Sequence, residues 1–168
     1  MAVPAAGRFA AYRLRPGGVK WHSGAETRRL LSLMSPANAA KVREAQRMGG
    51  MRVGTLYRRT RPVMVDGAVV SKAQRAEVRF DGVSGRLRTP AGGSSRQTAL
   101  IVEGERVRSR LLSPREAARL MGVPDAYPLP ERCNQACHLF GDGVAVPVVR
   151  WLEERLLRPL ACAVRGNA

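Results

Sequence analysis

Apolar residues in segment 23–49 recur every three or four positions, a spacing typical of helices. Ser23 followed by Glu26 forms a capping box, which marks the start of a helix. Ser35-Pro36 ends that helix and provides the N-cap and first residue of another. The pattern therefore predicts two consecutive helices in the first third of the chain.

After these helices the pattern changes to short runs rich in β-branched and aromatic residues, which are typical of strands. The runs are RVGTLYRRT at 52–60, AEVRF at 76–80, ALIVE at 99–103 and RVRSRLL at 106–112. Gly104 lies between the last two runs and predicts a hairpin turn. A polar, glycine-rich stretch at 87–98 separates the second and third runs.

The last third of the chain returns to helical spacing. In LLSPREAARLMGVPD, residues 111–125, Ser113 and Glu116 predict a helix start, and Gly122 predicts its end after about two turns. A longer helix is predicted from about Pro147, with Leu152 on its apolar side. The whole pattern is that of an α+β protein.

The charge of the chain indicates a polyanionic partner. It has 29 basic and 13 acidic residues, a net charge of +16, and residues 41–120 carry 18 basic and 7 acidic side chains. Only three of the basic residues are lysines, and the planar arginine side chain suits phosphates and guanine edges. A GC-rich genome also favours arginine, so the composition alone does not identify the partner, although double-stranded DNA is the expected one.

Several other classes of protein are disfavoured. No apolar run approaches the about 20 residues of a membrane span, and the first residues lack the apolar core of a signal peptide, so no membrane partner is expected. Three cysteines do not form a disulfide framework, which favours a reducing cytoplasm. Cys133, Cys137 and His138 have helical spacing, but no second ligand pair exists, and we predict no metal site.

The glycine-rich stretch and the arginines around it are candidates for DNA contact. Backbone amides of glycine can approach a phosphate or base closely, and the flanking side chains add donors, although such a stretch can also be a plain surface loop. The predicted DNA-binding residues are Arg58, Arg59, Arg61, Arg88, Thr89, Gly92, Gly93, Ser94, Arg96 and Gln97. Arg75 and Arg86 are further candidates for phosphate contact.

Two segments resemble conserved motifs of the bacterial, Dcm-like DNA (cytosine-5) methyltransferases. RLLSPREAARLMGVPD, residues 110–125, resembles the ninth motif, and FGDGVAVPVVRWLEERL, residues 140–156, resembles the tenth. The ninth motif is matched by Arg110, Pro114, Arg115, Glu116, Arg119, Leu120, Gly122 and Pro124. Both segments occur in the order and at the spacing of the family.

The resemblance implies a division of the chain. Residues 1–22 would be a lead-in segment, 23–109 a small β-rich target recognition domain, and 110–168 the closing segment with both motifs. The ninth motif would orient the recognition domain. The C-terminal helices would pack on an α/β methyltransferase domain that these 168 residues do not contain. The resemblance also implies that the protein is part of a bacterial restriction-modification enzyme and that it is located in the cytoplasm.

The resemblance also implies a cofactor, S-adenosylmethionine, bound only in complex with a catalytic half. The tenth motif would line its pocket with Gly141, Asp142, Gly143 and Val144. Asp142 stands where the family has asparagine, so an amide donor is replaced by an acceptor-only carboxylate. Within Arg115, Glu116 and Arg119 we expect a local charge network.

The motifs that perform the family's chemistry are absent from this sequence. It contains neither a Pro-Cys pair, the nucleophile, nor a Glu-Asn-Val segment. We therefore expect this chain to be the recognition and C-terminal part of a methyltransferase that needs a separately encoded catalytic half. An inactive gene remnant and an autonomous basic nucleic-acid-binding module are the alternatives.

We expect the purified chain alone to transfer no methyl group to DNA, because it lacks the cysteine that attacks the flipped cytosine. The measurement is incorporation of label from tritiated S-adenosylmethionine into DNA. Incorporation above that of a heat-inactivated sample would contradict this prediction.

Overall fold

The computed structural model describes residues 19–87, 89 and 97–166. The two predicted N-terminal helices are α1, Gly24–Ser32, and α2, Pro36–Arg47. The predicted capping box of α1 is confirmed: the Glu26 N–H donates to Ser23 Oγ, and the Ser23 N–H donates to the Glu26 carboxylate at 2.6 Å. Both helices therefore begin where their cap residues predict.

Four antiparallel strands form one sheet with the order β2-β1-β3-β4. The strands are β1, Met51–Val65, β2, Ala68–Arg79, β3, Thr98–Glu103, and β4, Arg106–Leu111. The hairpin predicted around Gly104 is confirmed, since β3 pairs with β4 and Gly104 has a φ of 55°. The α+β class is confirmed, although β1 and β2 are much longer than predicted.

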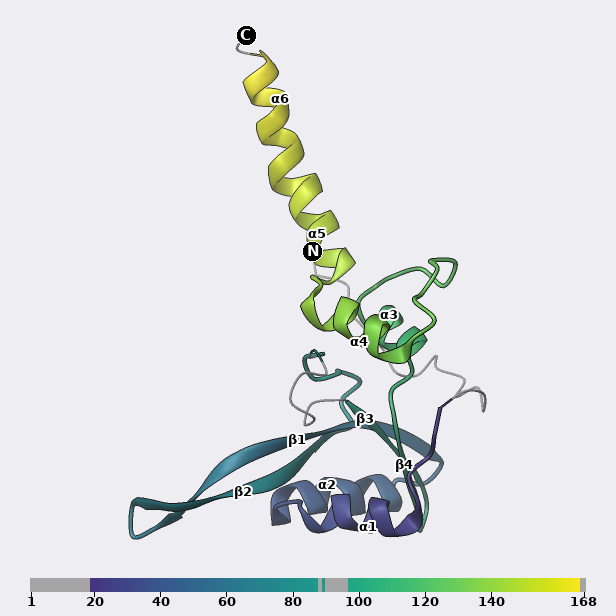
Figure 1. Ribbon diagram of the computed structural model, residues 1–168, viewed down its shortest axis with the longest axis vertical. Coiled ribbons are helices and arrows are strands. Elements are labelled where there is room, and N and C mark those ends of the chain that lie inside the picture. The colour runs from purple at the N-terminus through teal and green to yellow at the C-terminus, as the bar shows by residue number, and fades with distance from the viewer. Residues whose placement is uncertain (1–18, 88, 90–96, 167–168) are drawn as a thin grey trace.

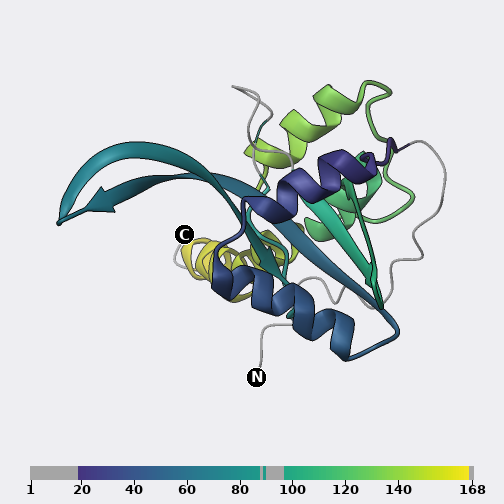
Figure 2. The ribbon, with the colours of Figure 1, turned by 90° about the horizontal axis from the view of Figure 1, so that it is seen from below.

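The extra length of β1 and β2 forms a hairpin that was not predicted from the sequence. Asp66 and Gly67 connect the strands with φ of 48° and 78°, the two positive values that a type I′ turn requires. An Asp-Gly pair between apolar runs is a strong hairpin signal, so this turn could have been predicted from the sequence. The hairpin extends beyond the helices as a two-stranded ribbon (Figures 1 and 2).

The main core lies between the sheet and the helices α1 and α2, which cover one of its faces (Figure 1). Strand β3 is buried on both faces. Leu100 and Val102 pack in the core with α1 and α2. Ala99 and Ile101 point to the other face, where they pack with Leu112 and its neighbours in a second cluster. The sheet is therefore the middle layer of the molecule.

The edge of β2 next to the helices is covered by polar groups of the α1–α2 region. The N–H of Ala76 donates to the carbonyl of Leu33 at 3.0 Å. The N–H of Val78 donates to Asn38 Oδ1 at 3.1 Å, and Lys41 Nζ donates to the carbonyl of Val78 at 3.3 Å. These bonds satisfy backbone groups that would otherwise be open to pairing with another chain.

The last third of the chain is helical. It contains α3, Pro114–Leu120, α4, Cys133–Asp142, and a long helix made of α5, Val146–Leu152, a π-helical turn, Glu153–Leu157, and α6, Arg158–Gly166. Helix α4 was not predicted. The π turn ends two residues before Pro159, which has no N–H to continue the α-helical pattern. The long helix projects away from the sheet (Figure 1). No helix among the described residues is long and apolar enough to cross a membrane.

A buried ion pair joins the sheet to α3. Arg110 of β4 is only 4% exposed, and its two terminal nitrogens donate to the two carboxylate oxygens of Glu116 at 2.8 and 2.6 Å. The N–H and the hydroxyl of Ser113 donate to the same carboxylate at 2.8 and 2.9 Å. Burial alone would raise the pKa of Glu116, but the hydrogen bonds from Arg110 and Ser113 outweigh it, and the pKa lies below its ordinary value.

We expect Glu116→Gln to lower the free energy of unfolding by about 3 kcal/mol near neutral pH, because it leaves the buried Arg110 charge without its partner. The pKa of Glu116 is lower in the folded state, so its stabilising effect is complete above the ordinary value of 4.5 and is lost as the pH falls through the folded value. The difference between the two proteins should therefore shrink in acid. Urea unfolding at several pH values measures it.

The control is Glu153→Gln, which removes a solvent-exposed ion pair with Arg158. Such a pair contributes little, so this variant should unfold almost as the unsubstituted protein does at every pH. Equal losses in both variants, or a loss in Glu116→Gln that does not change with pH, would contradict the role given to the buried pair.

Candidate DNA interface

The described start of the connection from β2 to β3, residues 80–87, lies on the face of the sheet opposite α1 and α2. Thr55 Oγ1 donates to the carbonyl of Val83 at 3.4 Å. A side chain at Gly85 would lie 2.7 Å from the amide of Gln97 and 3.4 Å from the ring of Tyr57, so the connection passes closely over β1 at this point. Its described ends are thus held against this face.

Three arginines extend the same face outward along the ribbon. Arg59 pairs with Arg75 across β1 and β2, and Arg61 follows Arg59 by two residues, so all three share a face with Tyr57 and Glu77. We call this surface the basic face and define it by Tyr57, Arg59, Arg61, Arg75 and Glu77.

Glu77 organises the side chains of the basic face. Its carboxylate accepts hydrogen bonds from the Tyr57 hydroxyl at 2.7 Å and from Arg61 Nε at 3.0 Å, and it forms an ion pair with Arg59 at 4.0 Å. The Arg59 guanidinium lies 4.8 Å from the centroid of the Tyr57 ring. Four side chains from two strands are therefore held in one network, and Arg75 lies next to it.

Electrostatics fixes the protonation of this network. Burial raises the pKa of Glu77, but hydrogen bonds from Tyr57 and Arg61 outweigh it and the pKa is lowered. The hydrogen bond to Glu77, together with burial, raises the pKa of Tyr57. At neutral pH Glu77 is ionised and Tyr57 is a hydrogen-bond donor, so the arginines keep their orientation.

The other predicted DNA-binding residues have different surroundings. Arg58 lies on the opposite face, paired with Ala76, which packs in the main core. Gln97 is only 5% exposed, and its amide donates to the carbonyl of Arg86 at 3.1 Å, so in this structure it holds the connection together. Arg86 is exposed and Thr89 is half-buried. Outside the described residues lie Arg88, Gly92, Gly93, Ser94 and Arg96.

Arg115, Glu116 and Arg119 do not form the expected network among themselves, because each has a partner other than these three residues. Glu116 binds Arg110, as described above. Arg119 binds the Asp125 carboxylate through two nitrogens, each at 2.6 Å. Arg115 donates to the carbonyls of Pro124 and Tyr127 at 3.4 and 2.9 Å. These contacts fix the turn that follows α3.

The two motif segments contact each other directly. The Val146 N–H donates to the carbonyl of Met121 at 2.8 Å. Gly122 has a φ of 74°, and a side chain there would lie 2.5 Å from Cδ of Pro147. Only glycine fits this position, both for its backbone conformation and for the close approach of α5. The start of the long helix is therefore attached to the end of α3.

Of the four residues implied in cofactor binding, Asp142, Gly143 and Val144 are exposed and Gly141 is half-buried. Gly141 and Asp142 lie in the last turn of α4. A side chain at Gly143 would lie 2.9 Å from the carbonyl of Leu139, so the helix end itself requires this glycine. The exposed side of these residues can supply one wall for a ligand.

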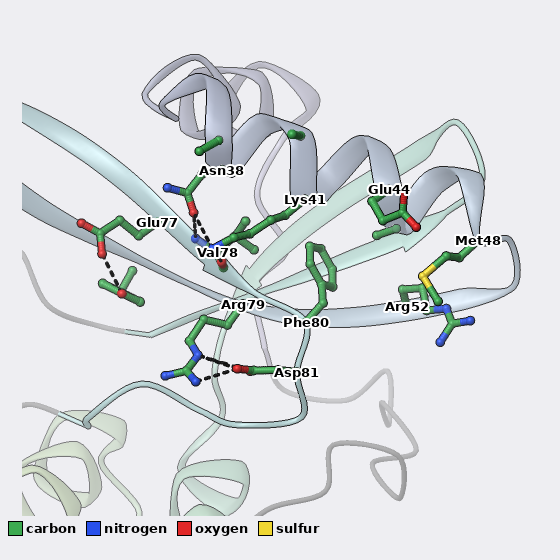
Figure 3. Close-up of a pocket in the computed structure, with 14 residues that line it drawn as sticks. Asn38, Lys41, Glu44, Met48, Arg52, Glu77, Val78, Arg79, Phe80 and Asp81 are labelled. Atoms are coloured by element: carbon green, nitrogen blue, oxygen red, sulfur yellow. Dashed lines mark hydrogen bonds and ion pairs between the residues drawn. The ribbon is translucent and has the colours of Figure 1, made fainter.

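A cavity of about 950 Å³ lies between α2 and the end of β2 (Figure 3). Its lining includes three basic and three acidic side chains, namely Lys41, Arg52, Arg79, Glu44, Glu77 and Asp81. The balanced charge gives no preference for an anion, and Asn38 and Lys41 are engaged by the backbone of Val78. The part of the chain that the structure describes also holds no group of three metal-ligating side chains. The basic face is the better candidate site.

Comparisons with known proteins identify relatives. The chain is 32% identical over 96 residues to the type II methyltransferase M.HhaI of Haemophilus parahaemolyticus, an alignment that covers 55% of this chain and 28% of the relative. It is 38% identical over 61 residues to M1.ScrFI of Lactococcus lactis subsp. cremoris, covering 36% of this chain and 16% of the relative. It is 45% identical over 51 residues to M.NgoBV of Neisseria gonorrhoeae, covering 30% and 12%.

The chain thus aligns with between 12% and 28% of the length of these relatives. No solved structure matches it. The family model described as C-5 cytosine-specific DNA methylase matches residues 26–158, which include the sheet, α3, α4 and the start of the long helix. The resemblance inferred from the two motifs is confirmed. The chain belongs to the family of C-5 cytosine-specific DNA methylases.

Proposed function

We propose that this chain is the DNA-recognition and C-terminal part of a type II, restriction-modification cytosine-5 methyltransferase, and that it acts with a catalytic half carrying the missing motifs. The observation that carries this proposal is the basic face, which lies beside the described start of the β2–β3 connection, residues 80–87, in a chain of this family. DNA is the substrate of the family, and arginines held by a fixed network suit its phosphates.

The proposed division of work follows from the positions of the charges. Arg75, together with the exposed Arg86, binds phosphates, while Glu77 keeps Arg59 and Arg61 oriented toward the same surface. The connection between β2 and β3 then approaches the bases. Phosphate contacts fix the position of the recognition part on the duplex, and contacts to base edges select the sequence.

The family uses S-adenosylmethionine, which supplies the methyl group when it is bound. In the proposed complex Gly141, Asp142, Gly143 and Val144 contribute one wall of its pocket, and the catalytic half contributes the rest. The exposure of Asp142, Gly143 and Val144 supports this arrangement, since residues that complete a shared pocket remain open in one half alone.

The long C-terminal helix is the proposed docking surface for the catalytic half. It exposes a series of large apolar side chains: Val148, Val149, Trp151, Leu152, Leu156, Leu157, Leu160 and Val164. The helix projects from the body (Figure 1), and none of these apolar residues belongs to a buried cluster of the described part of the chain. An apolar patch of this size is typical of a protein–protein interface.

We expect DNA binding by the chain to weaken steeply with salt. If about six arginines contact phosphates, a plot of log affinity against log salt should have a slope near about −5. Arg75→Ala should weaken binding and make the slope less steep by about one unit, because one phosphate contact is lost. Fluorescence anisotropy with a labelled duplex at several salt concentrations measures both quantities.

The matched control is Arg43→Ala, which removes the same charge from the exposed side of α2, on the opposite side of the sheet. It should leave the slope unchanged. Affinity that does not depend on salt, no binding at low salt, or equal effects of the two substitutions would argue against DNA recognition by the basic face.

We also expect Leu152→Asp to abolish co-purification of the chain with a catalytic half that carries the Pro-Cys and Glu-Asn-Val motifs. The substitution places a charge in the proposed apolar interface, at a cost of several kcal/mol, because that charge would be buried without a partner. Because Leu152 is exposed in the chain itself, its own folding should change little. A tagged pull-down compares the two proteins, and circular dichroism confirms the fold of the variant.

Arg150→Ala is the control for this experiment. It changes the net charge by the same amount and lies two residues earlier, on the far side of the same helix. It should leave co-purification intact. If the unsubstituted chain does not co-purify, or Leu152→Asp binds equally well, the chain does not dock through this helix.

A further inference from the structure

The end of the β1–β2 ribbon is a surface that the proposed function does not use. We define the arm as residues 62–72, which lie beyond the last pair of the basic face, Arg61 with Ala73. The arm extends well past the end of α2 in two perpendicular views (Figures 1 and 2). Its side chains are exposed except at Val63, which is half-buried.

The end of the arm is apolar. Met64, Val65, Val69 and Val70 are each more than half exposed, and we call these four residues the tip. Val63 pairs with Ser71 and Met64 with Val69, so Val70 is an extra residue in β2. An isolated two-stranded ribbon is marginally stable in water, and one with exposed apolar side chains tends to associate with another surface. The tip therefore gains from burial against another surface.

The charges of the ribbon favour DNA as that partner. Residues 57–77 contain five basic side chains and two acidic ones, Asp66 and Glu77. Among the ion pairs within the described residues, none involves Arg58, Lys72 or Arg75. A second copy of this chain brings another net charge of +16 and is repelled, whereas DNA phosphates attract the stem and allow the tip to be buried.

The width of the arm favours the major groove of DNA over the minor groove. Two strands about 4.8 Å apart, with their side chains, fill a major groove about 12 Å wide and are too broad for a minor groove of about 6 Å. The four residues from Pro62 to Val65 span about 13 Å, which corresponds to about four base pairs along the helix axis. The arm therefore has the width and reach to lie in the major groove next to the recognised sequence.

We propose that the arm enters the major groove of the duplex bound to the basic face, and that the tip packs against thymine methyl groups there. This inference rests on the proposed function, because it uses the same duplex. It adds a contact outside the basic face and the 80–97 connection. Apolar side chains bury the C5-methyl of thymine, which is the apolar feature that the major groove presents.

The test uses the full chain and two duplexes of the same sequence, one with thymine and one with uracil in its place, which removes only the methyl groups. We expect the unsubstituted chain to bind the thymine duplex more tightly, by about fourfold for each methyl group that the tip buries. The double variant Met64→Ser, Val69→Ser should bind both duplexes equally, at the level of the uracil duplex. These residues are exposed, so the variant should fold.

Two further variants complete the design. Met48→Ser, a methionine of similar exposure at the end of α2, should keep the preference for thymine. Replacing residues 62–72 with Asn-Gly removes the whole arm and leaves Arg59, Arg61 and Arg75 in place. In β2 the N–H groups of Ala76 and Val78 point away from β1, so the N–H groups of the alternate residues, including Ala73, point toward it. Arg61 and Ala73 therefore form a hydrogen-bonded pair, which is the kind of pair that closes a two-residue turn.

The outcomes separate the two proposals. If the unsubstituted chain binds neither duplex, the proposed function fails and the arm proposal fails with it. If it binds both duplexes equally, or if the shortened chain keeps the preference for thymine, only the arm proposal is overturned. It is also overturned if sedimentation shows that the tip holds two copies together and that Met64→Ser, Val69→Ser separates them.

Discussion

The buried ion pair between Arg110 and Glu116 is the interaction on which the arrangement of the molecule depends. Arg110 is the next-to-last residue of β4, and Glu116 lies in the first turn of α3, so the pair fixes the direction in which the chain leaves the sheet. Arg110 also faces the ring of Trp21 at 5.6 Å, which brings the segment before α1 to the same point. A buried charge pair contributes little net stability but strongly disfavours arrangements that separate it.

Contacts between the end of α3 and the start of α5 also fix the orientation of the C-terminal helix. Gly122, directly after α3, allows Pro147 to approach, and the Met121 carbonyl accepts from Val146 at the start of α5. The direction of the long helix is therefore set by α3, which is set by the sheet. The basic face and the proposed docking helix are connected through packed backbone rather than through a loose linker.

Sequence reasoning predicted the elements whose signals are local. Capping boxes at Ser23 and Ser113 and the turn at Gly104 depend on neighbouring residues, and all three are confirmed. Helix α4 was missed because its N-cap, Arg132, makes no side-chain cap bond and prolines precede it. The full length of β1 and β2 was not predicted, although Asp66-Gly67 signals the turn between them. The ends of these strands are exposed and apolar, so they lack the alternation of apolar and polar residues that marks a half-buried strand.

The candidate site was less predictable, because it depends on which residues share a face. Arg58, Arg59 and Arg61 are close in sequence, yet Arg58 points to the side of α1 and α2, and only pairing with β2 reveals this. Likewise, Glu116 was expected to pair within its own helix, whereas its partner is six residues earlier in a strand. The role of Glu77 could not be inferred, since its partners Tyr57 and Arg61 lie 20 and 16 residues away.

Glu77 also explains how so basic a surface can be selective. A carboxylate that holds Arg61 and lies near Arg59 offsets part of their charge, so these side chains gain less from a random phosphate than free arginines would. Arg75, without such a partner among the described ion pairs, keeps its full attraction. Arg75 thus contributes mainly to binding strength, whereas Arg59 and Arg61 contribute a fixed orientation. A duplex whose groups match Arg59 and Arg61 binds more tightly than one that only supplies negative charge.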